Sequence, residues 1–407
     1  MAFLAAVGLI LNVAIATQMG AAALGVFNQI YAIFIVTAQI AAFGLQDSTQ
    51  KHIAEYVNEK SIQRDIFGAA LMLSLFSGLS VSAVIYSGAD WIGHVTDSVQ
   101  FGKGLQVAAL GLPFIALNKV FMGKLNGARR MRALAVTQSL RGGGILLVCL
   151  AVIALNGAPY LLGLGLFLPE CFLTVIFFAF CGFPTLPWIT RWADWPRRHF
   201  SFAVRALGYG VLTESYIRID IIMLGFFVSD FKVGIYSFAA MFIEGLYQVA
   251  VVVRSVANPI IVPLVLAAKK SAIRSLARKF GMLSFGATGV VALTLAVSYP
   301  LFAEFFPDEI VLASYPILIV LFAGILPYSF FVPMDQIFLQ AGRPGIQSGL
   351  MIANVFMNIV LNAILIPRYG LIGAGAATAA AFLFAGITLN VVAARALGYR
   401  GGLIFVR

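Results

Sequence analysis

Charged residues are scarce in this 407-residue sequence. Asp, Glu, Lys and Arg make up 11% of it, whereas about 25% is usual in a soluble domain. Hydrophobic residues reach 61%, and the mean hydropathy is +0.98. No soluble fold could bury so much apolar surface, so the composition predicts a polytopic membrane protein surrounded by a lipid bilayer. The net charge of +11 then bears on membrane orientation, and we expect no nucleic-acid partner.

Cysteine and histidine are also rare. An odd number of cysteines inside apolar segments argues against a disulfide framework, and nothing has the spacing of metal ligands; these are Cys149, Cys171 and Cys181. The histidines lie apart in predicted loops with no nucleophile beside them, and we expect ordinary surface residues: His52, His94 and His199. We therefore expect no metal, no resident cofactor and no enzymatic activity.

Long apolar runs, by contrast, are abundant. A helix needs about 20 residues to cross a hydrocarbon core of about 30 Å. The first apolar run lacks the basic region of a signal peptide, since no Lys or Arg precedes Lys51, and is expected to be retained. Most of the 27 Lys and Arg residues fall in alternate loops, which predicts that both termini are cytoplasmic. Hydropathy predicts twelve spans, at 2–19, 25–45, 66–88, 104–122, 134–156, 160–183, 206–228, 233–256, 281–304, 311–337, 346–366 and 371–393.

The linker between the sixth and seventh spans divides the chain. We predict an N-terminal six-helix lobe (1–183), a cytoplasmic interfacial linker (184–205) and a C-terminal six-helix lobe (206–407). Interleaved Trp and Arg residues in the linker are typical of a segment at the inner leaflet. Motifs also recur in both halves, which predicts two parallel six-helix bundles with a site between them: Leu112-Pro113-Phe114 matches Leu326-Pro327-Tyr328, and Leu24-Gly25-Val26-Phe27 matches Val233-Gly234-Ile235-Tyr236.

The seventh span carries three charged residues near its middle, Glu214, Arg218 and Asp220. Charge at membrane depth is costly, so these side chains are expected to face other helices or a water-filled cavity. Glu214 and Arg218 are four residues apart and can pair on one helix face, whereas Asp220 points elsewhere. A structural ion pair and a transport site both explain such charge, and we favour the transport site.

The motifs resemble those of a known family. Leu24-Gly25-Val26-Phe27, Phe43-Gly44-Leu45, Ile219-Asp220 with Val233-Gly234-Ile235-Tyr236, and the stretch from Leu361-Asn362 to Gly373-Ala374 are similar to those of Wzx-like lipid-linked oligosaccharide flippases. These are polysaccharide biosynthesis proteins of the multidrug/oligosaccharidyl-lipid/polysaccharide exporter superfamily.

The resemblance implies an all-α polytopic fold of about 12 transmembrane helices, in two bundles around a central cavity. It also implies movement of an undecaprenyl-pyrophosphate-linked glycan from the cytoplasmic to the outer leaflet by alternating access. The expected setting is the bacterial inner (plasma) membrane. The glycan would serve O-antigen, capsule or exopolysaccharide synthesis, with a polysaccharide polymerase and glycosyltransferases as further partners.

A lipid pyrophosphate needs a wet, cationic path, and arginine suits phosphate because its planar fork donates two hydrogen bonds. Arg218 is the first candidate for the headgroup and Arg141 the second, while Arg254 is placed to receive it at the inner mouth. Lys119 is close enough to a helix end to extend to the lipid headgroups. Three amides on one face of the eleventh span fit sugar binding and helix-to-helix hydrogen bonding equally well: Asn354, Asn358 and Asn362.

Four acids lie deep in predicted spans, where such groups can bind the protons or sodium ions that drive a transporter. Glu214 is the expected partner of Arg218. That pairing leaves Asp220, Glu170 and Glu244 as candidates for ion coupling, with H⁺ or Na⁺ as the coupling ion. Pro169 precedes Glu170 and lacks a backbone N–H, which loosens the helix there.

Other functions fit parts of this pattern. A multidrug cation/H⁺ or Na⁺ antiporter of the same superfamily needs an acidic cavity; the buried acids favour it, and Arg141 and Arg218 argue against it. A membrane glycosyltransferase or polymerase acting on the same lipid would need a long polar outer loop for its catalytic groups, and no predicted outer loop is long. A pure scaffold would not need buried charge on several helices.

Overall fold

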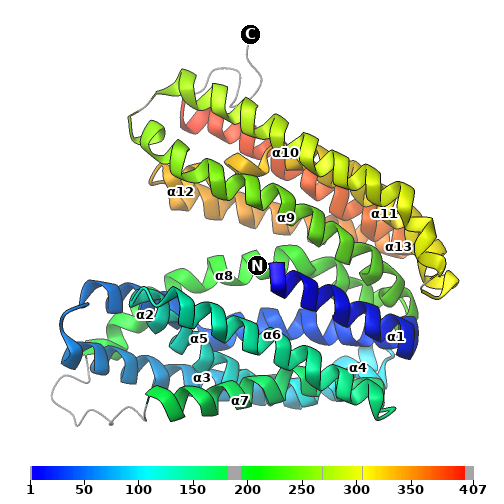
Figure 1. Ribbon diagram of the computed structural model, residues 1–407, viewed down its shortest axis with the longest axis horizontal. Coiled ribbons are helices and arrows are strands. Elements are labelled where there is room, and N and C mark those ends of the chain that lie inside the picture. Colours follow the sequence, from blue (N-terminus) through cyan, green and yellow to red (C-terminus); the bar gives the residue numbers. More distant parts are fainter. Residues whose placement is uncertain (1, 182–193, 268, 305, 399–407) are drawn as a thin grey trace. The chain divides into compact units, whose positions relative to one another are not determined.

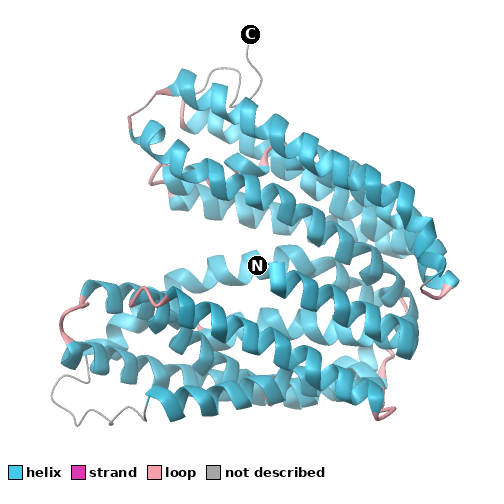
Figure 2. Cartoon of the chain, in the orientation of Figure 1, coloured by secondary structure: helices cyan, strands magenta, loops and turns pink. Residues whose placement is uncertain are grey.

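Every regular element in the described part of the chain is a helix (Figure 2). The computed structural model describes residues 2–181, 194–267, 269–304 and 306–398. In chain order the elements are α1 (Ala2–Ala42), α2 (Leu45–Glu55), α3 (Lys60–Val95), α4 (Val99–Ala109), α5 (Leu112–Gly127), α6 (Met131–Ala154), η1 (Pro159–Gly163), α7 (Leu164–Cys181), α8 (Asp194–Phe227), α9 (Asp230–Leu266), α10 (Lys270–Ser298), η2 (Tyr299–Glu304), α11 (Asp308–Ser329), η3 (Val332–Met334), α12 (Ile337–Gln340) and α13 (Pro344–Ala396) (Figure 1).

Helix lengths identify the membrane spans. Among the described residues, eight helices are long and apolar enough to cross a membrane, and α4 with α5, bent by 47°, counts as a ninth. At 1.5 Å per residue, α1 and α13 are about 60 and 80 Å long, twice the bilayer core or more. Each contains one glycine with non-helical torsion angles, Gly20 (φ 84°) and Gly370 (φ 56°).

Divided at those glycines, α1 and α13 each supply two spans. Helix α8 is not among the eight apolar helices, because its charged residues lower its hydropathy. When α8 is added, the helical segments overlap all twelve predicted ranges. The protein is therefore an all-α, multi-pass membrane protein, as its composition predicts.

Two compact units make up the chain. The N-terminal unit comprises Met1–Arg218 and Ser229–Gly234, and the C-terminal unit comprises Ile219–Val228 and Ile235–Arg407. The division falls inside α8, whereas the sequence placed it in the linker 184–205. Part of that linker, 184–193, lies outside the described residues, and the remainder is helical because α8 begins at Asp194.

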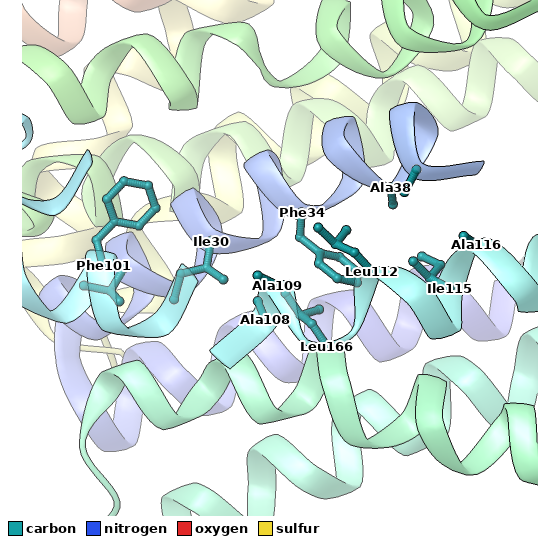
Figure 3. Close-up of a cluster of buried hydrophobic side chains, with 12 residues drawn as sticks. Ile30, Phe34, Ala38, Phe101, Ala108, Ala109, Leu112, Ile115, Ala116 and Leu166 are labelled. Carbon is teal, nitrogen blue, oxygen red and sulfur yellow. The ribbon is translucent and has the colours of Figure 1, made fainter. Parts of the chain in front are cut away.

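The N-terminal unit packs around a cluster of aliphatic and aromatic side chains from α1, α4, α5 and α7. Figure 3 shows Phe34 of α1 beside Leu112 of α5, with Leu166 below them. Alanines at 108, 109 and 116 keep the helices close enough for these larger side chains to interdigitate. Because lipid is as apolar as the core, such helices associate through close packing and hydrogen bonds more than through the hydrophobic effect.

The repeated Gly25 and Gly234 meet in this unit, at a close approach of α1 and the first turn of α9. A Cβ atom on Gly25 would lie 1.9 Å from the carbonyl oxygen of Asp230, and one on Gly234 would lie 1.9 Å from that of Ala21. Only glycine fits such backbone contact. Beside it, Asp230 accepts hydrogen bonds from Gln29 Nε2 (2.8 Å) and Ser98 Oγ (2.5 Å). Small-residue packing therefore explains this repeated motif.

Two of the three histidines are buried, so the prediction that they are surface residues is wrong for them. His52 is 9% exposed and His199 is fully buried, whereas His94 is exposed as expected. The segments predicted as loops are helical, in α2 and the first turns of α8, and these two histidines lie on their inward faces. Ser48 Oγ lies 2.8 Å from His199 Nδ1, and Nε2 lies 3.0 Å from the carbonyl oxygen of Ile66. Burial lowers the pKa of His199 to about 4.

Candidate functional site

An ion pair links α6 to α7 inside the N-terminal unit. Arg141 Nε donates to Glu170 Oε1, and their side chains are 20% and 2% exposed. The other carboxylate oxygen accepts from Asn118 Nδ2 of α5 at 2.8 Å, and Thr174 Oγ1 donates to Asn118 Oδ1 at 2.8 Å. Pairing and hydrogen bonding together make a buried carboxylate tolerable. Two predicted site residues, Arg141 and Glu170, are thus brought into direct contact.

A second polar chain crosses α5, α1 and α8. Lys119 Nζ donates to Gln39 Oε1 at 2.6 Å, and Gln39 Nε2 donates to Glu214 Oε1 at 3.4 Å. Lys119 is only 9% exposed, so the expectation that it extends to the headgroups is wrong. Gln39, which the sequence analysis did not single out, offers an acceptor inside the unit that removes the need to reach water.

These two chains form one charged network. The charges of Arg141, Glu214, Glu170 and, to the smallest extent, Asp47 all act on Lys119. The side chains linked by the printed contacts include two basic and two acidic residues, joined by neutral amides and a hydroxyl. Low dielectric strengthens each of these interactions and makes the loss of any partner costly. We call these residues the N-terminal charged network: Gln39, Asn118, Lys119, Arg141, Glu170, Thr174 and Glu214.

Arg218 lies one helical turn after Glu214, at the end of the N-terminal unit. Its guanidinium carbon is 4.6 Å from the centre of the Tyr31 ring of α1, within cation–π range. Stacking uses the face of the guanidinium, whereas phosphate recognition uses its N–H edge. The ion pair with Glu214 stays a prediction.

Asp220 belongs to the C-terminal unit and is 6% exposed. Tyr236 OH of α9 donates to one carboxylate oxygen, and Thr378 Oγ1 of α13 lies 3.3 Å from the same oxygen. The other oxygen accepts from the backbone N–H of Ile221 at 2.8 Å. Neutral donors thus surround this acid, and no described residue forms an ion pair with it. The sequence analysis quoted Tyr236 only within a family motif and did not single out Thr378, which lies 158 residues from Asp220; neither side chain carries a charge that would mark it.

Arg254 of α9 is paired within the C-terminal unit. Its Nη1 donates to Asp335 Oδ2, and the two side chains are 17% and 15% exposed. Asp335 was missed, although an acid at the end of an apolar predicted span was a usable signal. Glu244 lies on the same helix, ten residues earlier, and is half-buried.

The three amides of α13 share one face as predicted, but they are not equivalent. Asn358 and Asn362 are 1% and 0% exposed, and Asn362 Nδ2 donates to Asn358 Oδ1 at 2.5 Å. Asn354 is half-buried. The inner two amides therefore satisfy part of their hydrogen bonding within the helix. Among the described residues, no group of three His, Cys, Asp or Glu side chains could hold a metal ion.

A model of the family described as polysaccharide biosynthesis protein matches residues 2–265. This range is more than half of the chain. The chain belongs to the polysaccharide biosynthesis protein family. The resemblance drawn from its short apolar motifs is thereby confirmed. No curated protein sequence matches this family member.

Solved structures share the fold of this polysaccharide biosynthesis protein. The lipid II flippase MurJ, in an inward closed conformation, gives a TM-score of 0.77 at 15% identity, covering 95% of this chain and 84% of that chain. An inward-facing multidrug resistance MATE family transporter of the MOP superfamily gives 0.75 at 16%, covering 98% and 95%. A MOP superfamily transporter from Pyrococcus furiosus gives 0.67 at 15%, covering 97% and 93%. The chain therefore shares its fold with these three proteins.

Proposed function

We propose that this polysaccharide biosynthesis protein flips an undecaprenyl-pyrophosphate-linked oligosaccharide from the cytoplasmic to the outer leaflet by alternating access. The glycan would supply O-antigen, capsule or exopolysaccharide synthesis, before a polymerase and after glycosyltransferases. The protein would lie in the bacterial inner membrane with both termini in the cytoplasm. It performs no bond-making step in this proposal.

The observation that carries the proposal is cationic charge on membrane helices of a protein from this family. Arg141, Lys119 and Arg218 all lie in the N-terminal unit. The first is paired with Glu170 and the second is held by Gln39. Arg218 is stacked on an aromatic ring, which orients its planar fork for a phosphate. We therefore assign the pyrophosphate contact to Arg218, and a supporting role to Arg141 and to the Arg254–Asp335 pair.

Ion coupling is assigned to Asp220 by the same reasoning. Glu170 is paired with the cation Arg141, so it is assigned a structural role. Asp220 has neutral donors, so it can exchange a proton or accept a sodium ion without breaking an ion pair. Glu214 and Glu244 are weaker candidates, the first because it belongs to the N-terminal charged network.

Reconstituted protein tests the phosphate contact. In proteoliposomes holding a fluorescent undecaprenyl-pyrophosphate oligosaccharide, an impermeant reductant measures flipping. Arg218→Ala is expected to slow flipping at least tenfold, because a hydrogen bond to a charged group contributes about 1.5–3 kcal/mol. Arg218→Lys, which keeps the charge and loses the fork, should be intermediate. Wild-type flipping by Arg218→Ala, at equal insertion in the membrane, would remove Arg218 from the site.

A multidrug cation antiporter is the second candidate. Buried acids in both units favour it, and so does the fold shared with a multidrug resistance transporter. The same proteoliposomes, loaded with a cationic dye, distinguish the two. Dye efflux driven by an ion gradient, without lipid flipping, would favour the antiporter, whereas flipping that a dye does not inhibit would favour the flippase.

A further inference from the structure

A basic concavity lies at the end of the N-terminal unit where α2 and the first turns of α8 meet. It has a volume of about 330 Å³ and is lined by Lys51, His52, Arg197, Arg198, Ser201 and Phe202. None of these residues belongs to the N-terminal charged network or to the proposed transport path. We call it the α2–α8 basic pocket.

The walls of this pocket are fixed by buried neighbours. Trp195 is 6% exposed and packs with Ile53 and Ile66, while His199 is fully buried and hydrogen-bonded to Ser48. At 100° per residue, Trp195, His199 and Phe202 lie on the inward face of α8, whereas Arg197, Ser201 and Arg198 lie on the adjacent face. The basic side chains therefore project from a rigid base.

The cations are available to a ligand. Arg197 is exposed and forms no ion pair with any described residue. Arg198 lies over the Trp195 ring, 5.0 Å from its centre, which leaves its N–H edge for hydrogen bonding. Lys51 is 3.6 Å from Glu55, with both side chains about half exposed, and such a surface pair contributes about 0–1 kcal/mol.

Charge in the pocket favours an anion. Three cations and no acid are among its lining residues. Glu55, outside the lining, is 3.6 Å from Lys51 and 2.8 Å from His52 Nδ1. Asp194 lies three residues before Arg197, in the first turn of α8, and is not among the lining residues either. Two arginines and a lysine around one concavity offer the charge-assisted, forked hydrogen bonds that phosphate oxygens accept.

The surroundings indicate that the phosphate belongs to a lipid. On α8, Phe200 is 57% and Val204 is 50% exposed, and helical periodicity places both beside Arg197 and Ser201. From residue 206 the same helix continues into a predicted membrane span. A basic pocket at the start of a spanning helix, flanked by exposed apolar side chains, lies at headgroup depth.

We propose that the α2–α8 basic pocket binds the phosphate of an anionic phospholipid headgroup, with the acyl chains along Phe200 and Val204. The bound lipid would bridge α2 and α8, and would hold the start of α8 against the N-terminal unit. This site is separate from the proposed flipping path, so it stands whether or not the protein is a flippase.

Full-length protein in nanodiscs tests the site. Native mass spectrometry measures retention of phosphatidylglycerol in discs that otherwise contain phosphatidylcholine, and thermal unfolding measures its effect on Tm. The variant Arg197→Gln/Arg198→Gln is expected to retain phosphatidylglycerol at least tenfold less well and to lose the rise in Tm that this lipid gives. Lys51→Gln, on the other wall of the pocket, should give a smaller loss in the same direction.

A matched control removes two neighbouring exposed cations elsewhere, in Arg278→Gln/Lys279→Gln. It should retain phosphatidylglycerol as the wild type does. Equal loss in the control would mean general surface charge and would overturn the proposal. A second experiment adds inorganic phosphate to the protein in phosphatidylcholine discs. If phosphate raises the Tm as much as phosphatidylglycerol does, the site binds soluble phosphate and the lipid assignment is wrong. Unchanged lipid retention in both pocket variants would equally overturn it.

Discussion

Buried charge in this protein is balanced by neutral polar side chains as much as by opposite charge. The Glu170 carboxylate has a cation and an amide, and that amide accepts from a hydroxyl. Lys119 has a glutamine, and Asp220 has a tyrosine, a threonine and a backbone N–H. A group fixed by an ion pair keeps its charge, whereas a group fixed by neutral donors can change its protonation. This difference favours Asp220 over Glu170 as the residue for ion exchange.

The Arg141–Glu170 pair is expected to be a support. Arg141→Ala should lower the free energy of unfolding by about 3 kcal/mol, because it leaves a buried carboxylate without its cation. The double variant Arg141→Met/Glu170→Gln removes both charges and keeps an acceptor for Asn118, so it should recover most of that loss. Thermal unfolding in detergent measures stability, and the proteoliposome assay measures flipping. If the double variant is stable but no longer flips lipid, Arg141 takes part directly in transport and is not only a structural support.

At the scale of helices, glycine placement and helix continuity shape the molecule. Gly20 and Gly370 break two very long helices into spans of membrane length, and Gly25 and Gly234 let α1 and α9 touch through their backbones. The start of α8 is held in a different way, by aromatic and hydrogen-bonding contacts of Trp195 and His199 with α2 and α3. That docking rests on a histidine buried in its neutral form.

Docking of α8 is therefore expected to weaken in acid. His199 precedes the membrane span, and its pKa is lowered to about 4 by burial, against about 6.5 in an unfolded chain. Between these values the unfolded state binds the proton and the folded state does not, so stability falls as pH drops from about 6.5 towards 4. The expected slope is at most about 1.4 kcal/mol per pH unit.

Thermal unfolding of the whole protein between pH 8 and pH 5 measures this effect. His199→Gln keeps a donor for the Ile66 carbonyl and removes the titration, so its Tm should decline less below pH 6.5. The exposed His94→Gln serves as the control and should follow the wild type. If the Tm of His199→Gln falls with pH as steeply as that of the wild type, another group controls the acid response.

At the scale of the whole molecule, composition and hydropathy were sufficient for the fold, and short motifs were sufficient for the family. Twelve spans follow from local sequence, because the bilayer fixes how long each apolar helix must be. Charge at membrane depth also marked Arg141, Glu170 and Asp220 without a structure. The neutral partners of buried charges could not be predicted. Asn118 lies 52 residues from Glu170, and Gln39 lies 80 residues from Lys119. Such pairs depend on how each helix is rotated, and tertiary packing decides that.

The transport cycle as a whole should depend on Asp220. Asp220→Asn keeps the shape of the side chain and one acceptor oxygen, but it cannot release a proton or attract a sodium ion as a carboxylate does. In proteoliposomes, wild-type flipping is expected to accelerate when a proton or sodium gradient is imposed, and Asp220→Asn should flip at one slow rate with or without it. Asp230→Asn is the matched control, since this acid too is held by neutral donors, Gln29 and Ser98, but in the N-terminal unit. If the gradient still accelerates flipping by Asp220→Asn, Asp220 is not the coupling residue. If the acceleration is lost equally in Asp230→Asn, the effect is not specific to Asp220, and the assignment is rejected as well.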